Sequence, residues 1–149
     1  KEGSMKFSKF VCKCGCGRIA PPDIEQLIPE LNQLQRILWG VYDLVRGSWE
    51  AYITSGYRCE KRNAIIGGAK FSPHIWGIAM DFALMNLSHR EEVVEYLKSL
   101  GIVRVGHKKY EGIPNHIHID LAHKIADALY EAKKIPVEVW RAYKEAKEW

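Results

Sequence analysis

Three short polar clusters of the sequence contain the residue types that bind metals and catalyse reactions. They are SGYR at 55–58, SPHIWGIAMD at 72–81 and NHIHID at 115–120. In the last cluster polar and apolar residues alternate, which is typical of a half-buried β-strand whose successive side chains point to opposite faces. We therefore expect His116, His118 and Asp120 to share one face of a strand.

The middle cluster could supply metal ligands from a loop and from the strand that follows it. His74 comes directly after a proline, and Asp81 lies seven residues later between Met80 and Phe82. An aspartate in an apolar strand is costly to bury without a positive partner or a metal. With a histidine from a neighbouring strand, these residues would provide three ligands, the usual number for catalytic zinc. The alternative is a salt-bridged Asp81 beside unrelated histidines.

The sequence contains four cysteines, three of them in the run CKCGCG. They are Cys12, Cys14, Cys16 and Cys59. The CxCxC spacing is tighter than the two to four intervening residues usual in structural zinc sites. No secretion signal is evident at the start of the sequence, so we expect reduced thiols. The spacing therefore favours a glycine-rich loop with small buried thiols over a structural metal site.

Composition and charge limit the possible partners. A chain of 149 residues fits one domain, and 47% hydrophobic with 27% charged residues is typical of a globular protein. A net charge of +4 without a dense Lys/Arg stripe argues against a protein that binds duplex nucleic acid. The apolar runs are too short to cross a bilayer. We expect no nucleic-acid partner, no membrane insertion and a monomer.

Periodicity divides the chain into helices and strands. Helices are predicted over 21–46 (divided near Pro29), 59–66, 88–100, 122–133 and 136–147, and strands over 51–55, 77–84, 102–106 and 115–121. Ser88 and Glu91 have the spacing of a capping box, and Leu100 is expected to face inward. Strands and helices mix without regular βαβα alternation, which predicts an α+β domain with a small, mainly antiparallel sheet flanked by helices.

Taken together, the motifs resemble the signature of the M15 peptidase family, which contains zinc D-alanyl-D-alanine carboxypeptidases and related peptidoglycan peptidases. The resemblance rests on SGYR, Asn63, IGGA at 66–69, the pattern S-x-H-x-x-G-x-A-x-D at 72–81, and HIHID. It implies a hedgehog/DD-peptidase-like fold, because the hedgehog signalling domain shares this fold and metal layout. We expect the peptidase domain to span 5–121, with a C-terminal helical extension, 122–149, packed on it.

The resemblance also implies roles for individual residues. By position, the zinc ligands fall on His74, Asp81 and His118, which implies one Zn²⁺ ion. His116 would line the cavity and hydrogen-bond the attacking water or the developing oxyanion, or else support another ligand. Arg58 resembles the family arginine that reaches into the active site, where it can pair with a substrate carboxylate or polarise the scissile carbonyl, or else it only ties its turn to a neighbouring carboxylate. Ser72 would contact substrate, or else start the turn.

The general base departs from the family pattern. Many members have an acidic residue three positions before the last ligand, but here that position is Asn115, which cannot titrate. Glu111 lies seven positions before His118, near where the hedgehog-like pattern carries its glutamate. We therefore predict Glu111 as the base, assisted by His116. Asp120 could orient a ligand instead of acting as a base.

Three functions are compatible with the sequence. The first is a zinc peptidase that cuts peptidoglycan stem peptides, as a D-alanyl-D-alanine carboxypeptidase or a related endopeptidase. The others are a catalytically degenerate metal-binding wall module and a structural phage component. Without an evident signal peptide, the enzyme would be cytoplasmic, or phage-encoded and released to the cell wall. We expect His89, His107 and His123 to lie outside the site, and Trp140, Tyr143 and Trp149 to pack on the domain.

Overall fold

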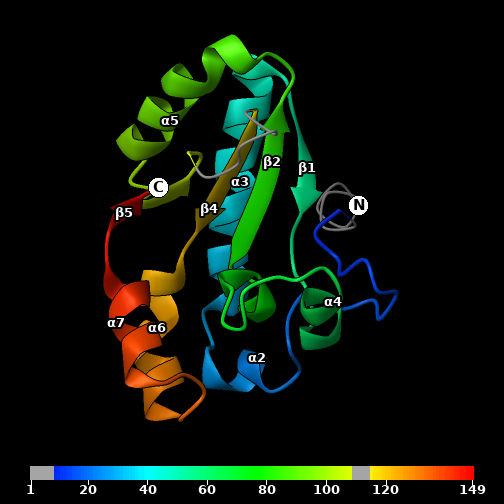
Figure 1. Cartoon of the computed structure of the whole chain (residues 1–149), viewed down its shortest axis with the longest axis vertical. Coiled ribbons are helices and arrows are strands. Elements are labelled where there is room, and N and C mark those ends of the chain that lie inside the picture. The colour runs from blue at the N-terminus through cyan, green and yellow to red at the C-terminus, as the bar shows by residue number, and fades with distance from the viewer. Residues whose placement is uncertain (1–8, 109–114) are drawn as a thin grey trace.

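A five-stranded sheet forms the centre of the computed structural model, which describes residues 9–108 and 115–149 (Figure 1). In spatial order the strands are β1 (Ala51–Ser55), β2 (Ala79–Leu84), β4 (His116–Asp120), β3 (Arg104–Gly106) and β5 (Lys147–Glu148). The first three neighbouring pairs are antiparallel, and β3 and β5 are parallel. The predicted α+β class with a mainly antiparallel sheet is confirmed, and the sheet is mixed.

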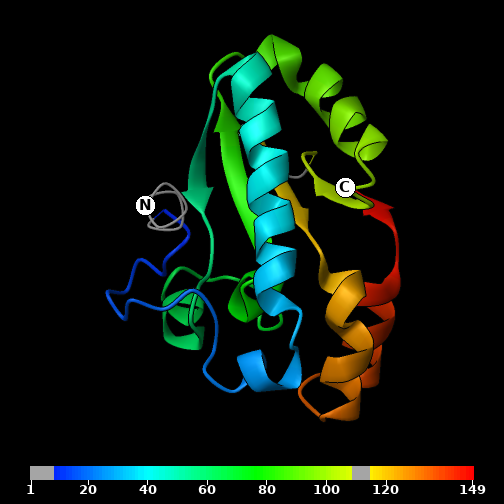
Figure 2. The ribbon, with the colours of Figure 1, turned by 180° about the vertical axis from the view of Figure 1, so that it is seen from behind.

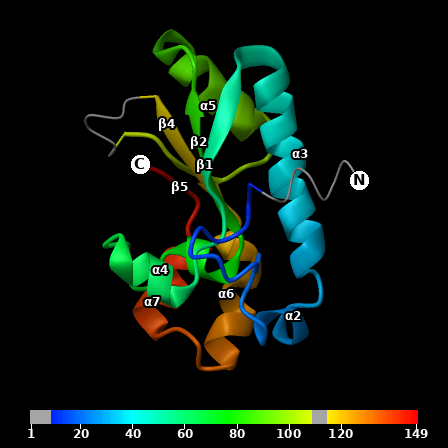
Figure 3. The same cartoon turned by 90° about the vertical axis from the view of Figure 1, so that its right-hand side faces the viewer.

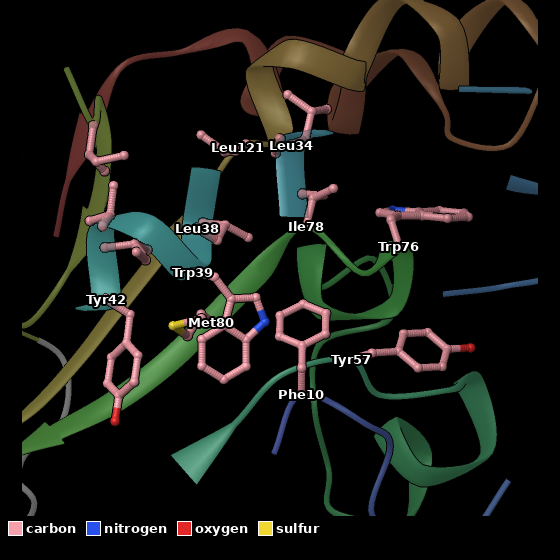
Figure 4. Packing of buried hydrophobic residues seen from close by; sticks show 14 of the residues in the cluster. Phe10, Leu34, Leu38, Trp39, Tyr42, Tyr57, Trp76, Ile78, Met80 and Leu121 are labelled. Carbon is pink, nitrogen blue, oxygen red and sulfur yellow. The ribbon is translucent and has the colours of Figure 1, made fainter. Parts of the chain in front are cut away.

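The long helix α3 (Leu31–Trp49) crosses one face of this sheet (Figure 2). Its apolar residues repeat at helical spacing, so one side of the helix can be buried against the strands. The shorter α2 (Ile24–Leu27) ends before Pro29, as predicted, because a proline is tolerated in a helix only in its first turn. Figure 4 shows Leu38 and Trp39 of α3 packed near Met80 of β2. The core thus holds β2, the strand that carries Asp81, between its neighbours and α3.

The remaining helices lie toward the two ends of the sheet (Figure 1). They are α4 (Glu60–Ile65), α5 (Arg90–Ser99), α6 (Ala122–Glu131) and α7 (Val137–Lys144), with two 3₁₀ turns at Pro73–Trp76 and Leu87–His89. Helix α5 lies at one end of the sheet and the others lie at the opposite end. In the described ranges, no helix combines the length and apolar character needed to cross a bilayer.

Three local predictions are wrong. The capping box is not formed: the Asn86 side chain accepts a hydrogen bond from Ser88 N at 3.0 Å, and α5 begins only at Arg90. Leu100 follows the end of α5 and is 38% exposed. The predicted last helix stops at Lys144, because the chain then extends to pair with β3 as β5.

The C-terminal aromatic residues contact other parts of the chain. Tyr143 is buried, and its hydroxyl accepts a hydrogen bond from Trp76 Nε1 at 2.9 Å and donates one to the Phe71 carbonyl. The indole of Trp149 covers Gly106, where an added Cβ would lie 2.9 Å from the ring. The absence of a side chain at Gly106 therefore makes room for an aromatic ring beside the sheet.

Candidate metal centre and active site

Strands β2 and β4 bring two of the predicted ligands together. Asp81 of β2 and His118 of β4 are directly opposite each other in the antiparallel ladder. Since opposite residues of such a pair project to the same face, the carboxylate and the imidazole meet. His118 Nδ1 lies 2.8 Å from Asp81 Oδ1.

The third predicted ligand comes from the turn before β2. His74 lies in the 3₁₀ turn that ends at Gly77, whose φ of 78° is the left-handed conformation that favours glycine. This turn sends the chain back toward the sheet and leaves His74 beside Asp81. One ligand atom from each of His74, Asp81 and His118 lies within 4.8 Å of the other two. The structure thus gathers the three predicted ligands in one buried cluster.

The hydrogen bonds of His74 leave one ring nitrogen with its lone pair directed at the cluster. His74 Nδ1 lies 2.7 Å from the carbonyl oxygen of Gly56, which can only accept, so Nδ1 carries the proton. In the neutral ring Nε2 is then unprotonated. Within the described residues this buried nitrogen makes no hydrogen bond, yet it lies 3.1 Å from Asp81 Oδ1. Two bare lone pairs would repel each other at this distance, so either a proton or a metal ion must lie between the nitrogen and the oxygen.

His118 is oriented in the same way by a buried carboxylate. Its Nε2 donates to Asp120 Oδ2 at 2.7 Å, and the other oxygen of Asp120 accepts from Arg104 Nε at 2.6 Å. Asp120 and Arg104 are both buried. The imidazole therefore turns Nδ1 toward Asp81, in the carboxylate–histidine arrangement that orients metal ligands. Of the two roles considered for Asp120, this geometry matches that of a residue that orients a ligand.

The electrostatics of the cluster favour a positive charge at its centre. Burial alone would raise the pKa of Asp81, but attraction to the His74 ring in its charged form and hydrogen bonds from His116 and His118 hold it well below its usual value. Burial would lower the pKa of His118, yet hydrogen bonds to Asp120 and Asp81 raise it to about 9. A divalent cation would satisfy the same lone pairs. Two imidazole nitrogens and one carboxylate oxygen are ligands that suit zinc, so the residues fit that ion.

A small cavity gives access to this cluster. It has a volume of about 210 Å³, and its lining includes Gly56, Arg58, Asp81 and His116. His116 Nε2 lies 3.4 Å from Asp81 Oδ2, so His116 lies next to the predicted ligands and lines the cavity. A larger cavity of about 650 Å³ is lined by none of these four residues. The volume of a cavity therefore does not identify the candidate site in this protein.

Arg58, which lines this cavity, contacts Ser72. Arg58 Nη2 donates to Ser72 Oγ at 3.1 Å, and the same hydroxyl accepts from His74 N at 3.3 Å. Ser72 therefore caps the turn that carries His74 and holds the guanidinium in place. Direct contact of Ser72 with substrate stays a prediction.

Of the two positions considered for the general base, the structure describes Asn115 and not Glu111. Glu111 lies outside the described residues. Asn115 Nδ2 donates to the Leu84 carbonyl at 2.8 Å, and Leu84 N donates to the Asn115 carbonyl at 2.9 Å. The Asn115 side chain thus extends the pairing of β2 with β4. A carboxylate at this position would face the Leu84 carbonyl oxygen and could not donate to it. The hydrogen bond therefore explains why an asparagine suits this position.

Sequence reasoning missed two residues that support the site. Gly56 supplies the carbonyl that orients His74, and Arg104 balances the charge of Asp120. The sequence feature that could have pointed to Arg104 is its position in a short strand, but only the structure shows that this strand lies next to the HIHID strand. His89 and His107 pair with Glu92 and Glu148 respectively, as expected of residues outside the cluster.

Comparison with known proteins gives one family. The family model described as Peptidase M15 matches residues 5–120, which include the whole of the buried cluster and the lining of the small cavity. Comparisons with curated proteins and with solved structures gave no significant match.

Proposed function

The chain belongs to the peptidase M15 family, and from this premise we propose that it is a zinc-dependent peptidase that hydrolyses peptide bonds in bacterial peptidoglycan. The finer proposal is a D-alanyl-D-alanine carboxypeptidase or a related endopeptidase acting on stem peptides. One observation carries the proposal of a zinc peptidase. Three potential ligand atoms converge beside a cavity that is also lined by Arg58, and they are His74 Nε2, Asp81 Oδ1 and His118 Nδ1.

The buried cluster is the proposed metal site. A zinc ion held by His74, Asp81 and His118 would polarise the scissile carbonyl and lower the pKa of a water molecule. Gly56 and Asp120 orient the two imidazole rings, so each turns its other nitrogen toward the ion, and His118 Nδ1 would lose its proton when the ion binds. This arrangement needs little rearrangement of the protein when the ion binds.

Arg58 is the proposed substrate-binding group. Its guanidinium lines the same cavity as Asp81 and is held by Ser72 at 3.1 Å. A planar guanidinium can make two parallel hydrogen bonds to a carboxylate, which suits the free carboxyl end of a stem peptide. In an endopeptidase the same group would stabilise negative charge on the carbonyl oxygen.

Proton transfer is assigned to Glu111 and His116. Glu111 would take a proton from the attacking water and pass it to the leaving amine. His116 lines the cavity at 3.4 Å from Asp81 Oδ2, where it can donate to an oxyanion or relay a proton. Glu111→Gln should reduce turnover by about a factor of 100 to 10,000.

The experiment uses purified muropeptides that end in D-alanine. Protein loaded with zinc should release D-alanine or a shortened stem peptide, detected by mass spectrometry. Glu111→Gln should lose most of this activity and keep its zinc, whereas the matched variant Glu95→Gln, at an exposed position of α5, should keep both. Full activity in Glu111→Gln would contradict the assignment of the base and leave the peptidase proposal intact.

The second proposed function is a metal-binding wall module without turnover. The observation that favours it is Asn115, whose amide is committed to the Leu84 carbonyl at the position where the family often has an acid. Zinc-loaded protein that binds muropeptides but cleaves none of them would support this module and contradict the peptidase.

A further inference from the structure

The four cysteines form a second cluster, separate from the histidine cluster. Cys12, Cys14 and Cys16 come from the N-terminal loop, and Cys59 comes directly before α4. Their sulfur atoms all lie within 4.8 Å of one another, although Cys59 is 45 residues from Cys14. Figure 3 shows the N-terminal loop, in dark blue, next to α4, as does Figure 1. The sequence interpretation of small buried thiols is wrong for Cys14 and Cys16, which are exposed.

The spacing of the sulfur atoms matches a tetrahedral metal site. Four thiolates at 2.3 Å from one zinc ion are separated from one another by about 3.8 Å. Here Cys14 Sγ and Cys59 Sγ are 3.5 Å apart, and every other pair lies within 4.8 Å. A disulfide joins only two sulfur atoms, at about 2.05 Å, and would leave the other two crowded beside it. One four-coordinate ion accounts for all four atoms together.

Backbone amides already donate to two of the sulfur atoms. Cys59 N lies 3.3 Å from Cys12 Sγ, and Arg62 N lies 3.4 Å from Cys59 Sγ. Such donors stabilise negative charge on thiolate ligands. The loop itself is closed by a hydrogen bond from Cys12 N to the Arg18 carbonyl at 3.1 Å.

Apolar burial does not account for the order of this loop. All six residues from Lys13 to Arg18 are exposed, and Gly15 and Gly17 have φ values of 90° and 74°. Glycine loses more conformational freedom on folding than any other residue, so this segment is expensive to order. A metal ion bound only by the folded arrangement would supply the missing stabilisation.

We propose that Cys12, Cys14, Cys16 and Cys59 bind a second, structural Zn²⁺ ion, distinct from the ion held by the histidine cluster. The four thiols lose their protons to solvent as the ion binds, and the resulting ZnS₄ centre carries two negative charges. Lys13, Arg18, Lys61 and Arg62 are the cationic residues of the loop and of the first turns of α4. With four protein ligands this site has no open position, so its role is structural.

The position of this ion ties the N-terminal loop to one wall of the active-site cavity. Cys59 directly follows Arg58, and Tyr57 N donates to the Phe10 carbonyl at 2.8 Å. Gly56, whose carbonyl orients His74, is packed so closely that an added Cβ would lie 2.6 Å from backbone atoms of Phe10. The ion would therefore stiffen the segment that carries Arg58 and supports His74.

The test counts zinc separately at the two sites. Protein purified under reducing conditions and dialysed exhaustively should contain two zinc ions per chain by elemental analysis. His118→Ala should contain one, and the double variant Cys14→Ser with Cys16→Ser should also contain one. Lys9→Ala, at an exposed position three residues before Cys12, changes no sulfur and should retain both.

A spectroscopic measurement covers the case in which the cysteine variant fails to fold. His118→Ala protein reconstituted with Co²⁺ should show the intense near-ultraviolet absorption of thiolate-to-cobalt charge transfer, which imidazole and carboxylate ligands do not produce. One zinc per wild-type chain, with all four thiols open to a thiol reagent in the native protein, would overturn the proposal. So would two disulfides, or iron with inorganic sulfide in place of zinc. None of these outcomes depends on peptidase activity.

Discussion

The substitution Asp120→Asn tests the arrangement that orients His118. Asparagine has nearly the same shape as aspartate but no charge. It therefore leaves Arg104 buried without its counter-ion and weakens the hydrogen bond at His118 Nε2, which is 2.7 Å long in the native protein. Both effects act on groups that are shielded from water, so screening by solvent does not reduce them.

Two magnitudes follow from this geometry. Removing one partner of a buried ion pair costs about 3–5 kcal/mol, and we expect about 3 kcal/mol here because the amide can still hydrogen-bond Arg104. Loss of a partner that orients a metal ligand lowers the metal affinity by about 10- to 100-fold. At a fixed excess of zinc, the stabilisation by the ion should then fall by about 1.4–2.7 kcal/mol.

The assay combines urea unfolding, with and without zinc, with a competition titration of zinc against a chelator. The control is Asp127→Asn on α6, which makes the same chemical change at an exposed residue that bonds Trp140 and Lys144. The control should keep the wild-type zinc affinity. If Asp120→Asn equals wild type in both zinc affinity and free energy of unfolding, the reasoning about His118 is refuted.

Three further predictions concern the cavity wall, its packing and the pH dependence of stability. Arg58→Gln should lower kcat/KM for muropeptides by about 100- to 1000-fold and leave zinc content unchanged; loss of zinc would mean that the arginine supports the metal site. Gly56→Ala should lower the free energy of unfolding by about 1–3 kcal/mol in urea titrations, because its Cβ would overlap the Phe10 backbone; an unchanged midpoint would contradict this. A hydrogen bond from His107 is the main cause that lowers the pKa of Glu148 to about 2 from an ordinary 4.5. The stability that this carboxylate contributes is thus present above pH 4.5 and lost as pH falls toward 2. Glu148→Gln should therefore weaken the pH dependence of the melting temperature of zinc-free protein over that range. An unaltered pH dependence would count against the pairing of Glu148 with His107.

The elements with strong local patterns were predictable from the sequence. The strand Ala51–Ser55 has the predicted bounds, and α3 follows the apolar repeat that begins after Pro29. Elements set by distant contacts were not predictable. Strand β5 has two residues and exists only because the chain passes beside β3. The start of α5 shows a related limit, since Asn86 competes with a capping pattern of the correct spacing.

The candidate site shows the same division between local and distant information. His74, Asp81 and His118 could be predicted as ligands because each falls in a short motif that resembles the family signature. Arg104 could not, since its partner Asp120 lies 16 residues away on another strand. The position of Cys59 could not be predicted for the same reason. The spacing of the other three cysteines did not favour a metal site, and nothing in the sequence indicates that Cys59, 45 residues from Cys14, lies beside them.

The pairing of Asp81 with His118 has a consequence for how the chain reaches its native sheet. The two residues are 37 positions apart, and their side chains meet only in one alignment of β2 with β4. A slip of one residue would turn His118 to the opposite face and bring an isoleucine in its place. An ion that needs both side chains therefore binds only the correctly aligned strands. Binding of the proposed ion would disfavour every shifted pairing, so the site would also favour the correct strand register during folding.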